Sequence, residues 1–266
     1  MPFPHFLESA MDELLYELRD GVAYLTFNRP QARNALTFAM YDRLAEICEQ
    51  ANQDRSIRAM LLTGAGEKAF AAGTDISQFR AFDKEQDALD YEARIDRVLG
   101  ALERCRVPTI AAIQGACTGG GAGIAACCDL RIAARSVRYG FPVAKTLGNC
   151  LSMNNYARLT ALMGPARVKD MVFRARLIEA DEALAMGLVS ELVEDGAALA
   201  RRAEELVREV ASLAPLTLQA TKEAIYRLRT KPEEGSDLVI MCYMSADFRE
   251  GMEAFLNKRK PVWKGR

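Results

Sequence analysis

The sequence predicts an α/β core followed by a helical C-terminal region. Short strand-like segments and amphipathic helix-like segments alternate through the first 195 residues. Glycine-rich segments follow two of the predicted strands, and only helical spacing is found from residue 197 onward. We therefore divide the 266-residue chain into a core, residues 1–196, and a helical region, residues 197–266. A chain of this length can bury a substantial core without disulfides or metal.

The predicted core begins with a β-hairpin. Residues 13–18 and 22–27 are typical of two short strands, and the Asp20-Gly21 pair between them favours a tight turn. Thr37 is expected to cap a helix that starts at the next residue. Apolar residues of that helix recur at three- and four-residue steps, which predicts one buried face: Phe38, Tyr41, Leu44, Ala45, Cys48 and Ala51.

The remaining elements are predicted in the same way, from the spacing of apolar residues and from residues that start or end helices. Further strands are predicted at 57–63, 109–114, 130–133 and 188–193. Helices are predicted at 85–105, 154–163, 165–173 and 181–186. In the helical region, Pro215 and residues 231–235 break the pattern before a last helix near 247–258.

The charge balance and hydropathy of the sequence argue against nucleic-acid and membrane partners. The chain has 35 Lys plus Arg against 36 Asp plus Glu, so we expect no nucleic-acid partner. Residues 1–10 lack the basic start and continuous apolar run of a secretion signal. No uninterrupted apolar run reaches the ~18 to 20 residues of a membrane helix. We therefore expect a cytoplasmic protein without a membrane partner.

Cysteine and histidine usage argues against two classes of enzyme. The seven cysteines form no C-x-x-C pair and are expected to be free thiols, most of them packed in the core. The single histidine, His5, precedes the first predicted strand. A Ser-His-Asp triad and a His-ligated zinc site are therefore not expected, and we predict no metal.

Two segments, residues 70–76 and 115–123, place glycines between a predicted strand and a following helix. The first amides of a helix are unpaired and carry partial positive charge, so such segments can stabilise developing negative charge. A tight turn with close helix packing is the alternative interpretation of the second segment. A dinucleotide fingerprint fits poorly, because Asp129 follows the last glycine too soon.

Five groups of residues, spread over about 240 positions, resemble the signatures of the crotonase (enoyl-CoA hydratase/isomerase) family. They are Asn28-Arg29-Pro30 with Asn34-Ala35-Leu36, Thr63-Gly64-Ala65-Gly66-Glu67-Lys68-Ala69-Phe70-Ala71-Ala72-Gly73-Thr74-Asp75, Gln114-Gly115-Ala116 with Gly119-Gly120-Gly121, Ala185-Met186-Gly187-Leu188-Val189, and Glu250-Gly251-Met252-Glu253-Ala254-Phe255-Leu256 with Lys258-Arg259. The resemblance implies a spiral of strand-strand-helix turns. It also implies trimers or dimers of trimers, formed through the helical region.

The resemblance further implies an acyl-CoA thioester as substrate, with coenzyme A part of that substrate and no separate cofactor. The backbone amides of Thr74 and Gly120 would hold the thioester oxygen, where two fixed donors stabilise an enolate better than the ground state. The implied CoA-binding residues, of which Arg33 and Lys68 lie toward the phosphates and the last two come from a neighbouring subunit, are Arg33, Lys68, Ala72, Asp75, Ile76, Phe255 and Lys258. Without the resemblance, Asp75 is interpreted as a helix cap.

Two positions depart from the hydratase pattern. Hydratases of the family carry glutamates where this chain has Gly123 and Val143, and neither residue can transfer a proton. An isomerase, decarboxylase or hydrolase is therefore favoured over a plain hydratase, and a catalytically silent CoA-thioester-binding scaffold is the alternative.

Substitute acid or base groups are predicted in two segments, and the sequence leaves the choice between them open. Lys145, Asn149 and Cys150 form one set, and Asp87, Tyr91 and Glu92 on the predicted helix form the other. The competing interpretations make Lys145 a surface lysine and Cys150 a buried thiol.

Overall fold

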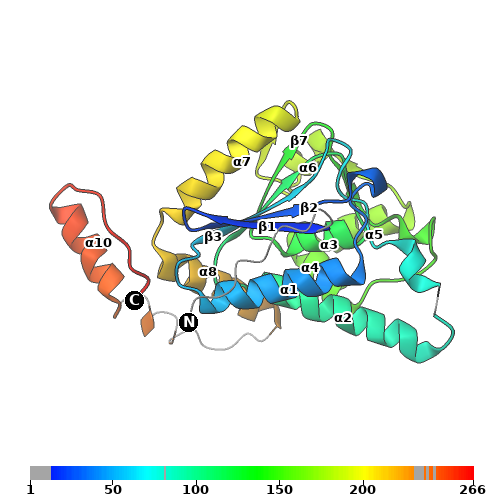
Figure 1. Ribbon diagram of the computed structural model, residues 1–266, viewed down its shortest axis with the longest axis horizontal. Coiled ribbons are helices and arrows are strands. Elements are labelled where there is room, and N and C mark those ends of the chain that lie inside the picture. Colours follow the sequence, from blue (N-terminus) through cyan, green and yellow to red (C-terminus); the bar gives the residue numbers. More distant parts are fainter. Residues whose placement is uncertain (1–12, 81, 231–236, 238–239, 242–243) are drawn as a thin grey trace.

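The computed structural model describes residues 13–80, 82–230, 237, 240–241 and 244–266, without the side chains of residues 255 and 256 (Figure 1). His5 and Cys242 lie outside these residues. The strands are β1 Leu14–Arg19, β2 Val22–Phe27, β3 Ala59–Gly64, β4 Ala69–Ala71, β5 Thr109–Ile113, β6 Ala116–Thr118, β7 Leu130–Ala134, β8 Arg138–Gly140, β9 Ile178–Glu179 and β10 Glu191–Val193.

Helices alternate with these strands, and after β10 the described elements are helices only. The α-helices are α1 Phe38–Gln53, α2 Glu85–Glu103, α3 Gly120–Cys127, α4 Met153–Met163, α5 Pro165–Phe173, α6 Ala180–Ala185, α7 Gly196–Ala211, α8 Pro215–Thr230 and α10 Ala246–Leu256. Three short 3-10 helices are η1 Pro30–Ala32, η2 Ile76–Phe79 and η3 Pro142–Ala144.

The chain winds as a spiral of strand-strand-helix turns. Three successive turns are β3-β4-α2, β5-β6-α3 and β7-β8-α4. The first strand of each turn belongs to a six-stranded sheet with the order β1-β2-β3-β5-β7-β10. The second strand of each turn belongs to a four-stranded sheet with the order β4-β6-β8-β9. Pairing is parallel except at β1/β2 and β8/β9. This arrangement confirms the α/β class and the crotonase-like spiral.

The N-terminal hairpin and the first helix form as predicted. Asp20 and Gly21 both have positive φ, 51° and 75°, which suits a two-residue turn between twisted strands. The Thr37 side chain accepts a hydrogen bond from the Met40 amide and caps α1. All the apolar residues predicted for the buried face of α1 after Phe38 are buried.

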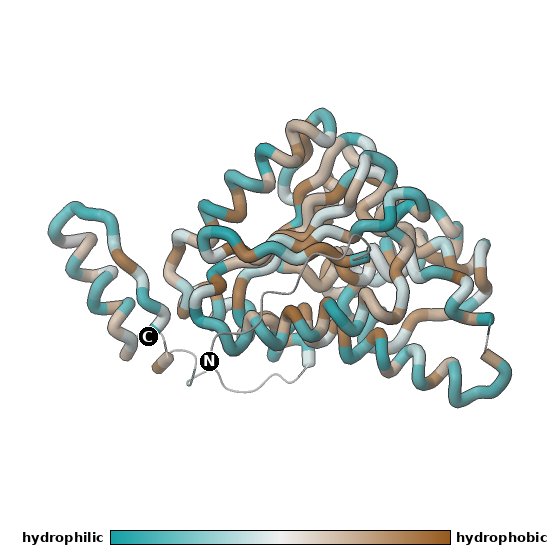
Figure 2. Tube along the Cα trace, viewed as in Figure 1, coloured by the Kyte–Doolittle hydropathy of each residue, from teal (hydrophilic) through white to brown (hydrophobic). Residues whose placement is uncertain are grey.

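Helices cover both faces of the six-stranded sheet (Figures 1 and 2). On one face, the main core packs the sheet against α1, α2 and α3. On the other face, α7 buries a stripe of Leu199, Ala203, Leu206, Val207 and Val210 against the sheet. The first helix of the region 197–266 therefore packs directly on the core sheet.

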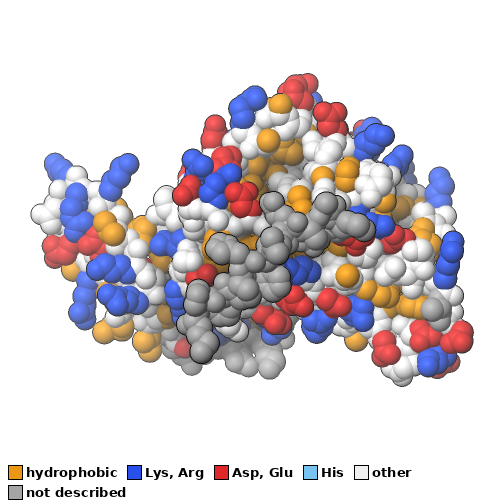
Figure 3. Space-filling view, in the orientation of Figure 1, with side chains coloured by type: hydrophobic (Ala, Val, Ile, Leu, Met, Phe, Trp, Pro, Cys, Tyr) orange, Lys and Arg blue, Asp and Glu red, His pale blue; other side chains and the backbone are white. Residues whose placement is uncertain are grey.

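The last helix, α10, lies apart from the main body at the left of Figure 1. Basic and acidic side chains are interspersed on the face shown in Figure 3, in keeping with the balanced charge of the sequence. Across the described ranges, no helix is long and apolar enough to cross a membrane. The expected trimer stays a prediction.

Candidate active site

Two glycine loops meet at the ends of neighbouring strands. The loop Gly73-Thr74 follows β4, the loop Gly119-Gly120 follows β6, and these two strands pair in parallel. A Cβ built on Gly119 would lie 3.4 Å from the Cα of Gly73, so the loops are in contact. The two segments that the sequence singled out are therefore brought together.

The Thr74 amide is left without a partner by the way its loop is held. Leu36 pairs with this loop on both sides of Thr74: its N–H donates to Gly73 O (2.8 Å), and its carbonyl accepts from Asp75 N (2.9 Å). Successive amides of an extended chain point to opposite sides, so the Thr74 N–H faces away from Leu36. Within the described residues it donates no hydrogen bond.

The Gly120 amide is unpaired for a different reason. Gly120 is the first residue of α3, and the first N–H groups of a helix have no partner within it. The preceding amide, of Gly119, donates to Gly140 O at 3.0 Å, whereas that of Gly120 has no acceptor in the described part of the chain. The partial positive charge of the helix start adds to this donor.

Three hydroxyl groups, which we call the hydroxyl cluster, lie beside these amides. Thr74 Oγ1 is 2.9 Å from the hydroxyl of Tyr41 on α1 and 2.9 Å from that of Tyr91 on α2. A Cβ on Gly120 would lie 1.8 Å from the Tyr41 hydroxyl and 3.3 Å from Thr74 Oγ1. The sequence predicted Tyr41 only as a core residue, since helical spacing reports burial and not the contact of a side chain's polar end.

The tyrosines of the hydroxyl cluster remain protonated over the physiological range. Burial raises the pKa of both Tyr41 and Tyr91 above the ordinary phenol value, and the bond to Thr74 lowers it less. Three phenylalanines pack around Tyr91 with ring centroids 4.9 to 6.1 Å away: Phe38, Phe79 and Phe82. Tyr91 therefore presents a neutral hydroxyl set in an aromatic wall.

Glu92 is a partly buried carboxyl group on α2 with a raised pKa, a property expected of an acid or base. Burial raises its pKa above the usual value, and the charge of Asp96 one turn away raises it further. Asp96 is itself bonded to Ser152 Oγ (2.7 Å) and Asn154 Nδ2 (2.8 Å). A hydrogen bond from the Ser152 backbone lowers the pKa less, and among the described residues no cation pairs with the Glu92 carboxylate.

Gly123 and Val143, where the resemblance implies glutamates in hydratases, both have apolar surroundings or side chains. Gly123 lies on α3, where an added Cβ would be 3.3 Å from Leu99 Cδ1 on α2. Val143 lies in η3 and is 8% exposed. Neither position offers a titratable group.

The first set of predicted acid or base residues lies at the surface. Lys145, Asn149 and Cys150 are all exposed. The side-chain amide of Asn149 donates to the adjacent Cys150 carbonyl at 3.4 Å, and no described bond joins any of the three residues to the hydroxyl cluster. The surface interpretation of Lys145 is confirmed. The buried interpretation of Cys150 is wrong, because the polar 145–150 segment runs outside the packed core.

The other described cysteines match the expectation of packed, free thiols. They are Cys48, Cys105, Cys117, Cys127 and Cys128, and all are buried. Burial raises the pKa of Cys117 well above its ordinary value, which keeps that thiol unreactive. In the described part of the chain, no group of three or more His, Cys, Asp or Glu side chains is placed to hold a metal.

Several predicted CoA-binding residues gather near the Thr74 loop. The Arg33 carbonyl accepts from the Ala72 amide at 3.0 Å, so these two residues are adjacent. Arg33 and Lys68 are exposed and have no ion pair among the residues described, and Ile76 is 60% exposed. The role of all these residues toward coenzyme A stays a prediction.

Asp75 caps η2, as its alternative interpretation requires. Its side chain accepts from the Ser77 amide at 3.1 Å and also pairs with Arg29 at 2.9 Å. Bonds from Ser77, followed by the Arg29 guanidinium, lower the pKa of Asp75. Lys258 follows α10 and is exposed, and the side chain of Phe255 lies outside the described residues.

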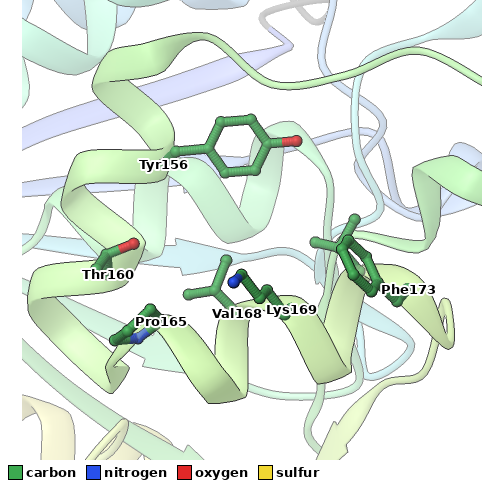
Figure 4. A pocket seen from close by; sticks show the side chains of 7 residues that line it. Tyr156, Thr160, Pro165, Val168, Lys169 and Phe173 are labelled. Carbon is green, nitrogen blue, oxygen red and sulfur yellow. The ribbon is translucent and has the colours of Figure 1, made fainter.

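A separate surface groove of about 240 Å³ lies between α4 and α5 (Figure 4). Its polar lining residues are Tyr156, Thr160 and Lys169. The apolar ones are Pro165, Val168, Val172 and Phe173. None of the predicted site residues lines this groove. We therefore place the candidate site at the two free amides, where unpaired donors and the hydroxyl cluster meet.

Comparisons with known proteins agree with this fold. The family model described as enoyl-CoA hydratase/isomerase matches residues 17–266. A short-chain-enoyl-CoA hydratase of Clostridium acetobutylicum is 34% identical over 258 residues, covering 94% of this chain and 97% of that protein. An (E)-benzylidenesuccinyl-CoA hydratase of Thauera aromatica is 36% identical over 254 residues, covering 94% and 98%.

A solved structure extends the agreement to three dimensions. The crystal structure of an enoyl-CoA hydratase/carnithine racemase from Magnetospirillum magneticum superimposes with a TM-score of 0.89 at 35% identity, covering 97% of each chain. Fold, signature order and near-complete coverage lead to one assignment. The chain belongs to the enoyl-CoA hydratase/isomerase family.

Proposed function

We propose that this protein is an enzyme that binds an acyl-CoA thioester and stabilises its enolate at the amides of Thr74 and Gly120. The observation that carries the proposal is the pair of free amides at the adjacent ends of β4 and β6. Coenzyme A is part of the substrate, and no separate cofactor takes part. A trimer or a dimer of trimers in the cytoplasm belongs to the same proposal.

The chemistry follows from where charge develops. Removing a proton alpha to a thioester, or adding a nucleophile beta to an enoyl thioester, moves negative charge onto the carbonyl oxygen. Fixed donors aimed at that oxygen stabilise the transition state more than the substrate. One such donor is worth ~2.7 to 4 kcal/mol in another enzyme, so two supply a large part of the barrier reduction.

The reaction we propose is of the isomerase, decarboxylase or hydrolase type. Gly123 and Val143 cannot transfer the protons that addition of water requires. The two relatives named above are called hydratases and the solved structure an enoyl-CoA hydratase/carnithine racemase, and these names describe those proteins. Glu92 is the better supported substitute acid or base, because it is partly buried and forms no ion pair among the described residues, whereas Lys145, Asn149 and Cys150 are exposed.

A catalytically silent CoA-thioester-binding scaffold is the second candidate, favoured by the same two positions. The candidates differ in turnover. We would incubate the protein with enoyl-, β-ketoacyl- and malonyl-CoA and detect products by mass spectrometry, with binding measured by calorimetry. Product from at least one thioester is expected. Tight binding of all three without product would favour the scaffold, and binding of none would overturn both.

The Gly120 donor is tested by removing one N–H. Any Cβ at Gly120 would strike the Tyr41 hydroxyl, so both test variants carry Tyr41→Phe. Gly120→Pro in that background deletes the amide proton at a helix position that accepts proline, whereas Gly120→Ala keeps it. We expect kcat of the proline variant to fall ~100-fold or more below that of the alanine variant. Equal kcat values would refute the oxyanion role.

A further inference from the structure

The hydroxyl cluster contains one more proton than its own bonds use. Tyr41, Thr74 and Tyr91 each bring one hydroxyl proton, and the cluster holds two hydrogen bonds, at 2.9 Å each. Each bond consumes one proton. Whatever the orientation of the hydroxyls, one proton is left over.

Burial decides which hydroxyl keeps the extra proton. Tyr41 is 1% exposed, and Thr74 Oγ1 is its hydrogen-bond partner within the described residues. If Tyr41 accepted that bond, its own proton would be buried without an acceptor, at a cost of ~1 to 3 kcal/mol. Tyr41 therefore donates to Thr74. The extra proton belongs to Thr74 or to Tyr91.

Both possible donors adjoin the candidate site, since Tyr91 is bonded to Thr74 at 2.9 Å. Thr74 Oγ1 lies 3.3 Å from the place a Cβ on Gly120 would take, so the extra donor is next to the Gly120 backbone. Around Tyr91, Phe38 and Phe79 provide ring faces and edges and no acceptor. A raised pKa keeps the Tyr91 phenol neutral, which suits a donor and not a base.

We infer that the hydroxyl cluster binds an oxygen of the acyl group, in addition to the thioester oxygen, by donating one hydrogen bond from Thr74 or Tyr91. This inference rests on the proposed function and names its substrate class: acyl-CoA thioesters with a keto or hydroxyl oxygen near the thioester carbon. A neutral oxygen fits better than a carboxylate. The negative charge of Glu92 raises the pKa of both Tyr41 and Tyr91, and the same charge would repel a ligand carboxylate bound at the cluster.

A site built to donate a hydrogen bond discriminates against a ligand that lacks the acceptor. The aromatic wall would also exclude the water that could otherwise take the proton. A neutral hydrogen bond of this kind is worth about three- to tenfold in affinity. The preference should therefore be measurable between two ligands that differ by a single oxygen.

The test compares acetoacetyl-CoA with butyryl-CoA by isothermal titration calorimetry on the full-length protein. We expect tighter binding of acetoacetyl-CoA, and a loss of about three- to tenfold of this preference, taken as the ratio of the two affinities, in whichever of Tyr91→Phe and Thr74→Val removes the donating hydroxyl. Thr74→Ser keeps the hydroxyl and should keep the preference. Thr74→Val keeps the backbone amide, so it leaves the proposed oxyanion donor in place.

Tyr24→Phe is a matched control, because Tyr24 loses one comparable bond, to Glu204 on α7, at the opposite face of the sheet. That variant should bind both ligands as the wild type does. A wild-type preference that survives both Tyr91→Phe and Thr74→Val, or no preference at all, would overturn the inference while leaving the proposed function intact. Failure of both ligands to bind would overturn the proposed function itself.

Discussion

The carboxylate of Asp75 lies 2.9 Å from the guanidinium of Arg29, and this ion pair ties the Thr74 loop to the segment before α1. Arg29 also donates to the Ala35 carbonyl at 2.6 Å, next to the Leu36 residue that pairs with the loop. The direction of the Thr74 amide therefore depends on two charged side chains that form no hydrogen bond with it.

We predict that Asp75→Asn destabilises the protein at neutral pH by roughly 0.2 to 1 kcal/mol, because the charge that pairs with Arg29 is lost while the amide oxygen can still cap η2. Bonds from Ser77 and Arg29 lower the pKa of Asp75 below its ordinary value of 3.8. A lowered pKa means that the carboxylate stabilises the fold above that value and loses this effect as pH falls through the folded-state pKa. Urea unfolding at pH 7 and below pH 3.8 checks this, and a difference that is constant across pH would contradict it.

Gly121→Ala is predicted to be strongly destabilising, because its Cβ would lie 2.1 Å from the Ala71 carbonyl oxygen. We expect a loss of about 1 to 3 kcal/mol in the free energy of unfolding as α3 is pushed from β4. Gly100→Ala on α2 is the control. Its Cβ would meet nothing closer than 3.8 Å, so it should stabilise the helix by about 0.5 to 1 kcal/mol. Thermal unfolding of both variants decides whether close approach or backbone freedom governs these positions.

Glu92→Gln should stabilise the fold at neutral pH. Burial, together with Asp96, raises the pKa of Glu92 above 4.5, so the native state favours the protonated carboxyl. The ionised carboxylate therefore lowers stability as pH rises through the raised pKa, whereas no penalty exists below the ordinary value. Chemical denaturation at pH 4 and pH 8 should show a gain at pH 8 alone. If Glu92 is the acid or base, activity falls in the same variant.

Gly120 and Tyr41 should show strong energetic coupling. Gly120→Ala alone places a Cβ 1.8 Å from the Tyr41 hydroxyl and should be destabilising, whereas the same change beside Tyr41→Phe meets the ring carbon Cζ at 3.1 Å. A double-mutant cycle should give a coupling of about 1 to 3 kcal/mol that favours the double variant. Additive effects of the two substitutions would show that the hydroxyl does not fill this space.

Long elements with a regular spacing of apolar residues could be predicted from the sequence. Short elements whose bounds depend on tertiary contacts could not. The helix predicted at 165–173 is α5 to the residue, because Pro165 marks its start. The strand predicted at 188–193 is reduced to β10 because Leu188 and Val189 both donate to the Ala183 carbonyl and close α6. Strands of two or three residues, such as β4 and β9, are too short to show an alternation.

The candidate site divides in the same way. The segments 70–76 and 115–123 could be predicted, because glycine patterns mark strand ends and helix starts, and the family resemblance singled out Thr74 and Gly120 within them. The hydroxyl cluster could not, since Tyr41 and Tyr91 reach Thr74 from two helices that are distant in sequence. Exposure of Cys150 depends on the path of a loop, which local residue preferences do not determine.

The two free donors of the candidate site are peptide groups, and this affects how the site can change over generations. A codon change at position 74 or 120 alters a side chain and leaves the N–H in place, proline excepted. Mutation can therefore exchange the neighbouring side chains without erasing these two donors. Such a scaffold can acquire a new reaction while it keeps an old binding mode.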